Sequence, residues 1–391
     1  MSELASSPSA TVSPVLTGRP VVILGGGVIG TSIAFHLAER GYSDVVVVER
    51  GLIGEGSTAR ATGGIRQQFT SEINVRMVRQ AVDFFRDFTE RTGSPLNFRQ
   101  HGYLFLLTSQ AQLTAFRAAA EMQRRLGVPT ELLTPSEVRD IHPEIRLDGV
   151  LGAAYCATDG SADPNDAVQG FAKAARSRGV RILQHTEVTA IELGGVHTDT
   201  AGFLEAELVL LATGPQARAT GRLAGAELPV APHRRQAFAI GSLPWLTPDL
   251  PFTVDLGSGA YLHPETGGGL IGGNDRDVPE GTDTAVDWSL TEPLIEALVH
   301  RFPAMTEATI TRGWAGLREM TPDDHAIVGP IEDRPGLWCA VGFSGHGFMQ
   351  SPAVGDQLAS WLLDGAPTID LAPLRHSRFA EQELIMEGVR F

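Results

Sequence analysis

Three glycines and one glutamate have the types and spacing of a site that binds a nucleotide diphosphate. Gly25, Gly27 and Gly30 form a G-x-G-x-x-G turn, and Glu49 lies further along the chain. Gly25 permits a tight turn, Gly27 lets the backbone approach a pyrophosphate, and Gly30 lets a helix pack on the preceding strand. The N-terminus of that helix would face the phosphates. Glu49 can accept hydrogen bonds from ribose hydroxyl groups, and its charge argues against a 2′-phosphate.

The segments around this turn are those of a βαβ unit. Residues 20–24 and 45–48 are short apolar runs, typical of buried parallel strands. Residues 31–41 place apolar side chains on one helix face and end at a glycine. Residues 21–50 are therefore predicted to bind a dinucleotide. A second G-x-G-x-x-G at residues 267–272 has no strand before it and no helix after it, so it predicts a β-hairpin.

Composition narrows the class of partner. The 391 residues suggest two or three domains of roughly 150 residues each. The net charge of −15 argues against nucleic acid and anionic membranes as partners, and no apolar run could span a membrane. Lys173 is the only lysine, so arginine must supply the positive charge of almost any site. Cys156 and Cys339 predict buried thiols rather than a disulfide or a metal site. Residues 1–17 predict a disordered tail, and the cytoplasm is the expected compartment.

Apolar runs like the buried strands of the βαβ unit recur far along the chain. Residues 206–214 and 337–347 each read as a buried strand followed by a glycine turn, and residues 180–183 and 187–191 resemble parallel strands. Between residues 229 and 310, short alternating runs with Gly and Pro turns indicate an antiparallel sheet. Helices are predicted at residues 72–92, 111–126, 166–178, 288–302 and 348–363, and near residue 136, with Ser136 as a cap.

The predicted fold class is α/β, with a Rossmann-like nucleotide domain and an inserted domain built on an antiparallel sheet with helices. The nucleotide domain is expected at residues 18–95, 150–225 and 311–391, and the substrate-binding domain at residues 96–149 and 226–310. Such interleaving disfavours a simple NAD dehydrogenase and favours a longer cofactor that distant segments hold.

Five motifs, in this order, resemble the FAD-dependent amine and amino-acid oxidoreductases. That family includes D-amino-acid oxidase, glycine oxidase, monomeric sarcosine oxidase and the sarcosine oxidase β subunit. The resemblance covers residues 20–365. Its motifs are residues 22–30 with Glu49, 63–69, 211–214, 316–323 and 342–348. It implies FAD, with the adenosine on residues 21–50 and the isoalloxazine between the domains. Gly316 stands about where monomeric sarcosine oxidases tether the flavin through a cysteine, so the FAD is expected to be non-covalent.

The resemblance also assigns cofactor contacts. Glu49 would bind the adenosine ribose, Ser57 and Thr58 the phosphates or ribityl chain, and Val188 the adenine through its backbone. The turn at residues 345–347 would place a helix N-terminus near the flavin C2 carbonyl, where its dipole stabilises negative charge. The full expected set is Gly25, Gly27, Val28, Ile29, Gly30, Glu49, Arg50, Ser57, Thr58, Val188, Thr213, Gly214, Gly345, His346, Gly347 and Phe348.

The implied reaction is oxidation of a C–N bond by hydride transfer to flavin N5, followed by hydrolysis of the imine. Arg318, Arg66 and Tyr261 match residues that bind the substrate carboxylate in this family, and His346 is placed near flavin or substrate. The alternative roles are interdomain salt bridges for the arginines, sheet packing for Tyr261 and a structural hydrogen bond for His346. His325 is expected to orient a loop, and no metal site is expected.

Two departures from sarcosine oxidases bear on the electron acceptor, which is expected to be O2 or another molecule. Met349 stands where some of them carry a lysine that helps to bind the carboxylate, and Ile271 appears at the place of a lysine that promotes reaction with O2. These residues favour a dehydrogenase or a subunit that passes electrons to a partner. Two alternatives are oxidation of a 2-hydroxy acid, with His346 or His263 as the base, and an electron-passing flavoprotein subunit of a larger complex.

Overall fold

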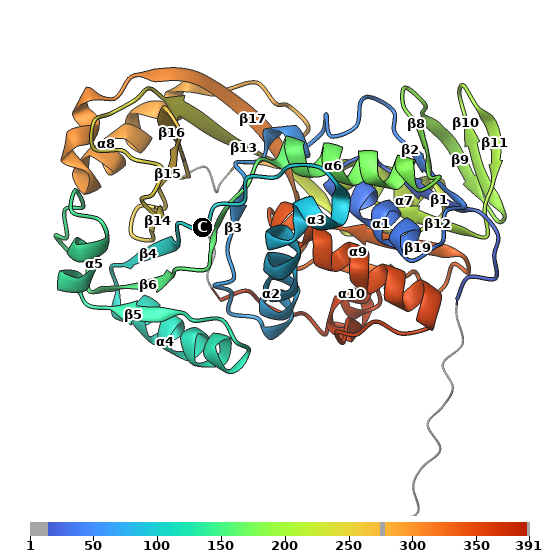
Figure 1. Ribbon diagram of the computed structural model, residues 1–391, viewed down its shortest axis with the longest axis horizontal. Helices are drawn as coiled ribbons and strands as arrows, with labels where there is room; N and C mark the ends of the chain where they lie inside the picture. Colours follow the sequence, from blue (N-terminus) through green and yellow to red (C-terminus); the bar gives the residue numbers. More distant parts are fainter. Residues whose placement is uncertain (1–14, 274–277, 389–391) are drawn as a thin grey trace, which may run out of the picture.

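The computed structural model describes residues 15–273 and 278–388, and it forms two lobes (Figure 1). Most of the tail expected at residues 1–17 therefore lies outside the described residues. One lobe is built on a six-stranded sheet and the other on an eight-stranded sheet. Parallel strands carry helices in the first lobe, so the predicted α/β class is confirmed.

The six-stranded sheet has the order β18-β19-β12-β1-β2-β8. All its pairings are parallel except that of β18 with β19. β1 and β2 are buried at every residue, which explains their uniformly apolar sequences. The strands are β1 (Val21–Leu24), β2 (Val45–Val48), β8 (Arg181–Leu183), β12 (Leu208–Leu211), β18 (Ile327–Pro330) and β19 (Leu337–Val341).

Four long helices pack against one another in the lobe of this sheet. α1 (Val28–Glu39) lies between α6 (Pro164–Ser177) and α9 (Gly347–Asp364), and α2 (Glu72–Arg86) packs against α9. α6 exposes Lys173 on its outer side. The predicted helix at residues 72–92 is interrupted at Asp87, where the backbone leaves helical geometry, and continues as α3 (Phe88–Thr92).

Residues 187–191 do not join the parallel sheet, contrary to expectation. They form β9 (Val188–Glu192), which pairs antiparallel with β10 (Gly195–Thr198), and β10 pairs with β11 (Gly202–Glu205). No residue of β9 is fully buried. A segment with one side in solvent does not need the apolar faces of a central parallel strand, and its polar residues already reflect this.

The eight-stranded sheet has the order β17-β13-β16-β15-β14-β4-β6-β5. β15 and β16 form an antiparallel hairpin, which confirms the prediction for the second glycine-rich match. Most pairings are antiparallel, and β14 with β4 is parallel. The strands are β4 (Tyr103–Leu107), β5 (Glu131–Leu133), β6 (Gly152–Cys156), β13 (Ala231–Ile240), β14 (Phe252–Asp255), β15 (Tyr261–Glu265), β16 (Gly268–Gly272) and β17 (Ile310–Met320).

Three helices accompany the second sheet: α4 (Gln110–Arg125), α5 (Pro135–Ile141) and α8 (Thr291–Arg301). Thr134, not Ser136, caps α5, because its side chain accepts from the backbone of Glu137 in a capping box. The division into two domains remains a proposal. β6 and β17 belong to the eight-stranded sheet. The substrate-binding domain would therefore extend past the boundaries expected at residues 150 and 311, so that it includes both strands.

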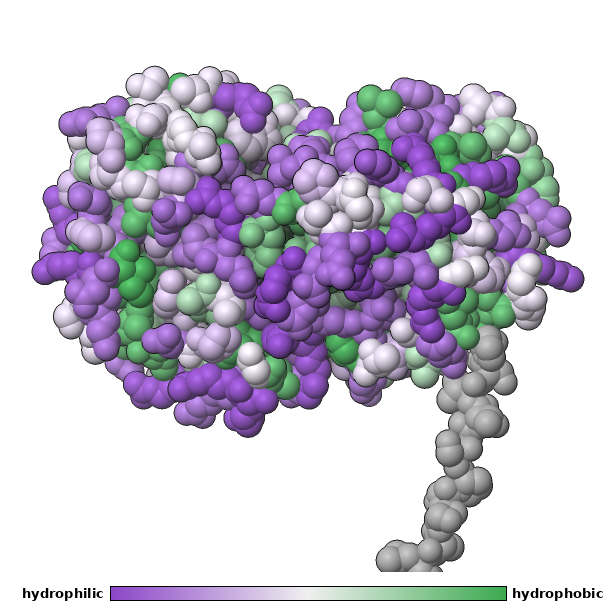
Figure 2. Space-filling view, in the orientation of Figure 1, coloured by the Kyte–Doolittle hydropathy of each residue, from purple (hydrophilic) through white to green (hydrophobic). Residues whose placement is uncertain are grey.

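The visible surface is mostly hydrophilic, with apolar residues in small groups on both lobes (Figure 2). In the described part of the chain, no helix is long and apolar enough to cross a membrane.

Candidate active site

A cavity of about 930 Å³ lies where the two lobes meet. Its walls come from the carboxyl ends of β1, β2 and β12, from the loop at residues 49–66, and from β13, β15, β17 and the start of α9. Every residue that the sequence proposes for cofactor or substrate binding lines this cavity except Gly30. The structure thus brings together residues from six separate segments of the chain, and their individual roles stay predictions.

Glycine is required on geometric grounds at the first turn. Gly25 has φ +109°, and a Cβ there would lie 2.3 Å from the carbonyl oxygen of Ala212. A Cβ at Gly30 would lie 2.1 Å from the carbonyl oxygen of Gly25, so Gly30 acts from outside the cavity by letting α1 pack closely. Gly27 is the N-cap of α1 and offers no capping side chain. The N-terminus of α1 therefore faces the cavity as an anion-binding element.

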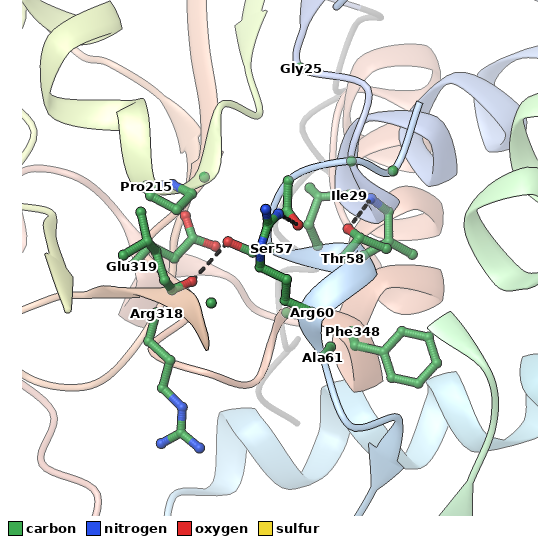
Figure 3. Close-up of a pocket in the computed structure, with 18 of the residues that line it drawn as sticks. Gly25, Ile29, Ser57, Thr58, Arg60, Ala61, Pro215, Arg318, Glu319 and Phe348 are labelled. Carbon is green, nitrogen blue, oxygen red and sulfur yellow. Dashed lines mark hydrogen bonds between the residues drawn. The ribbon is translucent and has the colours of Figure 1, made fainter. Parts of the chain in front are cut away.

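Two side chains support this end of the cavity. Thr58 Oγ1 accepts a hydrogen bond from the Val28 N–H at 3.1 Å (Figure 3). The Glu49 carboxylate accepts from the backbone N–H groups of Gly26 at 2.7 Å and Gly51 at 2.8 Å. These bonds fix the carboxylate at the end of β2 while its oxygens keep lone pairs for hydroxyl donors.

A second helix N-terminus faces the same cavity. α9 begins at Gly347, and its N-cap His346 makes no side-chain capping bond. Gly345 has φ +93°, and a Cβ there would lie 2.9 Å from Nε of Arg318, so glycine lets this arginine approach the turn. The start of α9 can stabilise negative charge on a group bound beside it.

Arg66 and His346 form a buried pair beside this turn. Nη2 of Arg66 lies 3.2 Å from Nε2 of His346, and Nη1 donates to the Gln68 carbonyl at 2.8 Å. The Arg66 guanidinium lies 4.0 Å from the centre of the Phe69 ring. Burial, together with the charges of Arg66 and Arg318, holds the pKa of His346 well below its usual value. His346 is therefore neutral, and Nε2 accepts from Arg66.

An aromatic wall closes part of the cavity. Tyr103 stacks on Phe252 with ring centres 4.2 Å apart, and Phe252 lies 5.2 Å from Tyr261. Burial raises the pKa of Tyr103, so its hydroxyl stays protonated. Tyr103 was not predicted as a site residue. In the sequence it is one apolar position of a strand, and only the pairing of β14 with β4 brings it beside Phe252.

Glu319 is a second cavity residue that the sequence did not single out. Its Oε2 accepts from the Gly342 N–H at 3.0 Å, and burial raises its pKa to about 7. Glu319 and Arg318 extend to opposite sides of β17 (Figure 3). The only signal was its place beside Arg318 in one of the motifs.

Met349 and Ile271, which are expected to stand in place of two sarcosine oxidase lysines, lie in different surroundings. Met349 lines the cavity, whereas Ile271 is fully buried in the core of the second lobe and does not. The match of Ile271 to the position of that lysine stays a prediction. His263 is also buried outside the cavity lining, and burial lowers its pKa to about 3.

Cys156 and Cys339 are free and buried, and neither is among the cavity residues. Within residues 15–273 and 278–388, no cluster of His, Cys, Asp or Glu could hold a metal ion. Nδ1 of His325 donates to the Asp323 carbonyl at 2.7 Å, and its Nε2 lies 2.8 Å from the Ser71 hydroxyl, which suits a residue that orients a loop.

The cavity fits FAD. Two helix N-termini suit a diphosphate and an electron-rich ring, the glycine turns leave room for close backbone contact, and Glu49 suits a ribose. The residues that would hold FAD are the expected set, with Gly30 acting through helix packing.

Known proteins resemble this chain along most of its length. The L-proline dehydrogenase of P. horikoshii is 34% identical, with a TM-score of 0.88, covering 94% of this chain and 99% of that one. The glycine oxidase of Geobacillus kaustophilus is 29% identical, with a TM-score of 0.80, over 92% and 98%. Human mitochondrial sarcosine dehydrogenase is 27% identical over 95% of this chain but 42% of its own length. The chain thus spans about half the length of the curated relatives it matches first.

The family described as FAD dependent oxidoreductase (DAO) matches residues 20–361. This match covers most of the chain and includes every predicted site residue. The protein therefore belongs to this family of FAD-dependent oxidoreductases.

Proposed function

We propose that this protein oxidises the C–N bond of a small amino acid or amine, with a secondary or N-methyl amine preferred. The product is an imine, which water hydrolyses. The observation that carries the proposal is the convergence of Arg66, Arg318 and Tyr261 on one cavity beside the start of α9. The names of the relatives, which include proline, glycine and sarcosine enzymes, support the substrate class.

The arginines are proposed to hold the substrate carboxylate. Arg318 reaches the cavity from β17, and its planar guanidinium can bind a carboxylate through two parallel hydrogen bonds. Arg66 is anchored by Gln68 and His346 and adds fixed positive charge. Tyr261 would donate its hydroxyl to the same carboxylate. Together these groups orient the α-carbon, which is the main requirement of a reaction that needs no strong base.

FAD, when bound, supplies the acceptor for the hydride that leaves the α-carbon. The surrounding residues favour an amine over a 2-hydroxy acid, because a hydroxyl must lose its proton to a base. His346 is neutral, but its Nε2 already accepts from Arg66, and His263 lies outside the cavity lining. An amine that binds in its neutral form needs no such base.

Anaerobic bleaching of the flavin absorbance tests this function. We expect sarcosine, glycine or L-proline to bleach the bound flavin, and L-lactate to leave it oxidised. Bleaching by lactate but by none of the amines would contradict the proposal. Air is then admitted to the bleached sample. We propose an acceptor other than O2, since Met349 lines the cavity and Lys173, the only lysine, does not. Slow return of the absorbance is expected, and rapid return would favour an oxidase.

A further inference from the structure

The short segment that carries Arg66 has no regular structure after its first residues and must be held from outside. β3 (Gly64–Ile65) ends just before Arg66, and α2 begins at Glu72. Residues 66–71 are nevertheless buried, apart from Thr70. Arg66 packs on Phe69 of the same segment, so a shift of the segment would move the guanidinium.

Buried side chains hold the first half of this segment. Asp159 accepts from the Gln67 N–H at 2.9 Å and from the Gln68 side chain at 3.0 Å. Gln123 of α4 donates to the Phe69 carbonyl at 2.7 Å. These contacts come from α4 and from the loop that follows β6, and they fix residues 67–69.

Glu387, near the end of the described chain, holds the second half. Its carboxylate accepts from the Thr70 N–H at 2.6 Å and from the Thr70 hydroxyl, and from Ser71 Oγ at 3.1 Å and Asn74 Nδ2 at 3.4 Å. Glu387 is only 5% exposed. The Gly388 N–H donates back to Thr70 Oγ1 at 2.6 Å. One carboxylate thus joins the Arg66 segment to the first turn of α2.

The chain before Glu387 is itself anchored. Arg378, on α10 (Arg378–Glu381), donates through Nε and Nη2 to the two oxygens of Asp323 at 2.8 and 2.9 Å, and both side chains are fully buried. The Ile385 N–H approaches Asp323 Oδ2 at 3.4 Å. Asp323 follows β17, which carries Arg318. The C-terminal segment therefore connects the segments of both substrate arginines.

We infer that Glu387 is a positioning residue for substrate binding: the C-terminal segment, residues 378–388, holds Arg66 in the place from which it attracts the substrate carboxylate. This inference rests on the proposed function. Glu387 is not among the cavity-lining residues; its hydrogen bonds reach the Arg66 segment through Thr70 and Ser71, and its negative charge also favours the charged form of Arg66. Its loss weakens binding of a carboxylate substrate before it affects the hydride-transfer step.

The test compares Glu387→Gln, Glu387→Asp and the matched control Glu383→Gln in the holoenzyme. Glu383 lies on the same segment, but its side chain is 67% exposed and pairs with Arg375. For the amine that bleaches the wild type best, Glu387→Gln is expected to raise KM roughly tenfold while kcat stays within about twofold, because a displaced Arg66 loses ground-state binding. Glu387→Asp should recover part of this loss, and Glu383→Gln should match the wild type.

An unchanged KM in Glu387→Gln, with the wild type active, overturns the inference and leaves the proposed function intact. A fall in melting temperature and FAD content with no change in KM also overturns it, since that is a purely structural effect. If no amine bleaches the wild type, the proposed function itself fails. Should Glu387→Gln not fold, Thr70→Val removes the partner hydroxyl instead: a raised KM supports the inference, and an unchanged KM overturns it.

Discussion

The guanidinium of Arg66 is buried, and its neighbours stabilise the positive charge there. Burial lowers the pKa of this guanidinium, and the negative charges of Glu387 and Asp159 oppose that shift. The two carboxylates are themselves buried and hydrogen-bonded. A charge fixed in this way attracts an anion without reorganising when the anion arrives, which is the property a substrate-binding cation needs.

Arg318→Lys is expected to raise KM for an amino-acid substrate by roughly tenfold or more, because lysine cannot reproduce a bidentate guanidinium pair with a carboxylate. Steady-state kinetics over a range of substrate concentrations measures the effect. Arg312→Lys is the matched control, since Arg312 lies exposed on the same strand and packs on Trp314. Equal KM values for the two variants would remove Arg318 from the proposed carboxylate site.

Glu319 predicts a pH-dependent stability. Its pKa rises on folding from 4.5 to about 7, chiefly through burial. The protonated carboxyl therefore contributes its full stability below pH 4.5, and the contribution is lost as the pH rises through about 7. In flavin-free protein, Glu319→Gln should be roughly 1–3 kcal/mol more stable than the wild type at pH 8 and equal to it near pH 4.5.

Urea unfolding at the two pH values measures this difference. Glu292→Gln, at an exposed position of α8, serves as the control and should follow the wild type at both. A difference between Glu319→Gln and the wild type that does not change with pH would mean that the carboxyl is ordinary in the folded protein.

At this scale the sequence predicted residues whose role follows from their type and local spacing. The glycine turns, Glu49 and the two arginines all line or support one cavity. The roles of Tyr103, Glu319 and Glu387 were not predicted, because their neighbours come from distant strands and from the end of the chain. Nothing in the local pattern around Glu387 distinguishes it from an exposed glutamate.

Two elements of the fold, the N-termini of α1 and α9, converge on the cofactor cavity from strands of the same six-stranded sheet. Both follow a glycine turn after a buried parallel strand, β1 and β19, and both lack a side-chain cap. Helix N-termini without caps leave their N–H groups for a ligand. β12 lies between β19 and β1 in the sheet, and the turn that follows it also lines the cavity.

Gly25→Ala is expected to abolish FAD binding and to lower stability by several kcal/mol, on the order of 3, because the backbone has positive φ and the new Cβ meets the Ala212 carbonyl. The ratio of flavin to protein absorbance and the melting temperature measure the two effects. Gly281→Ala is the control, since a Cβ there meets nothing within 4 Å. Normal flavin content in Gly25→Ala would show that the turn can relax.

The sheet or helix to which a segment belongs could be predicted where its residues are uniformly buried. The predictions failed where burial is partial. The apolar strands β1, β2, β12 and β19 followed directly from their sequences. β9 was assigned to the wrong sheet because its short alternating run does not specify a partner, and the tight connection to β10 decides the pairing. The interruption at Asp87 carries no proline or glycine, so the sequence offered no signal for it.

On the scale of the whole molecule, the Asp323–Arg378 pair ties the C-terminal segment to the rest of the protein. Asp323→Asn is expected to lower the free energy of unfolding by about 3–5 kcal/mol, because it leaves the Arg378 charge buried without its partner. Chemical denaturation at pH 7 measures the loss. The control Glu227→Gln removes an exposed partner of Arg222 and should change little.

The Asp323–Arg378 pair also makes the stability of the folded protein depend on pH in the acid range. Burial would raise the pKa of Asp323, but hydrogen bonds and charge from Arg378 outweigh it and hold the pKa below 3.8. The stabilisation is therefore complete above pH 3.8 and is lost as the pH falls through the lower, folded-state pKa. The wild type and Asp323→Asn should approach each other in stability in strong acid, and a constant gap would contradict the assignment.

Lys173 has a consequence for how the protein can be labelled or modified. Its side chain is the one primary amine among the side chains of the whole sequence, and it lies exposed on α6, which packs against α1. A dye that reacts with ε-amines will therefore attach at a single known place beside the first lobe's sheet. By the same reasoning, acetylation or ubiquitination of a lysine side chain can occur at only one position of this sequence, and that position is not among the residues that line the cavity.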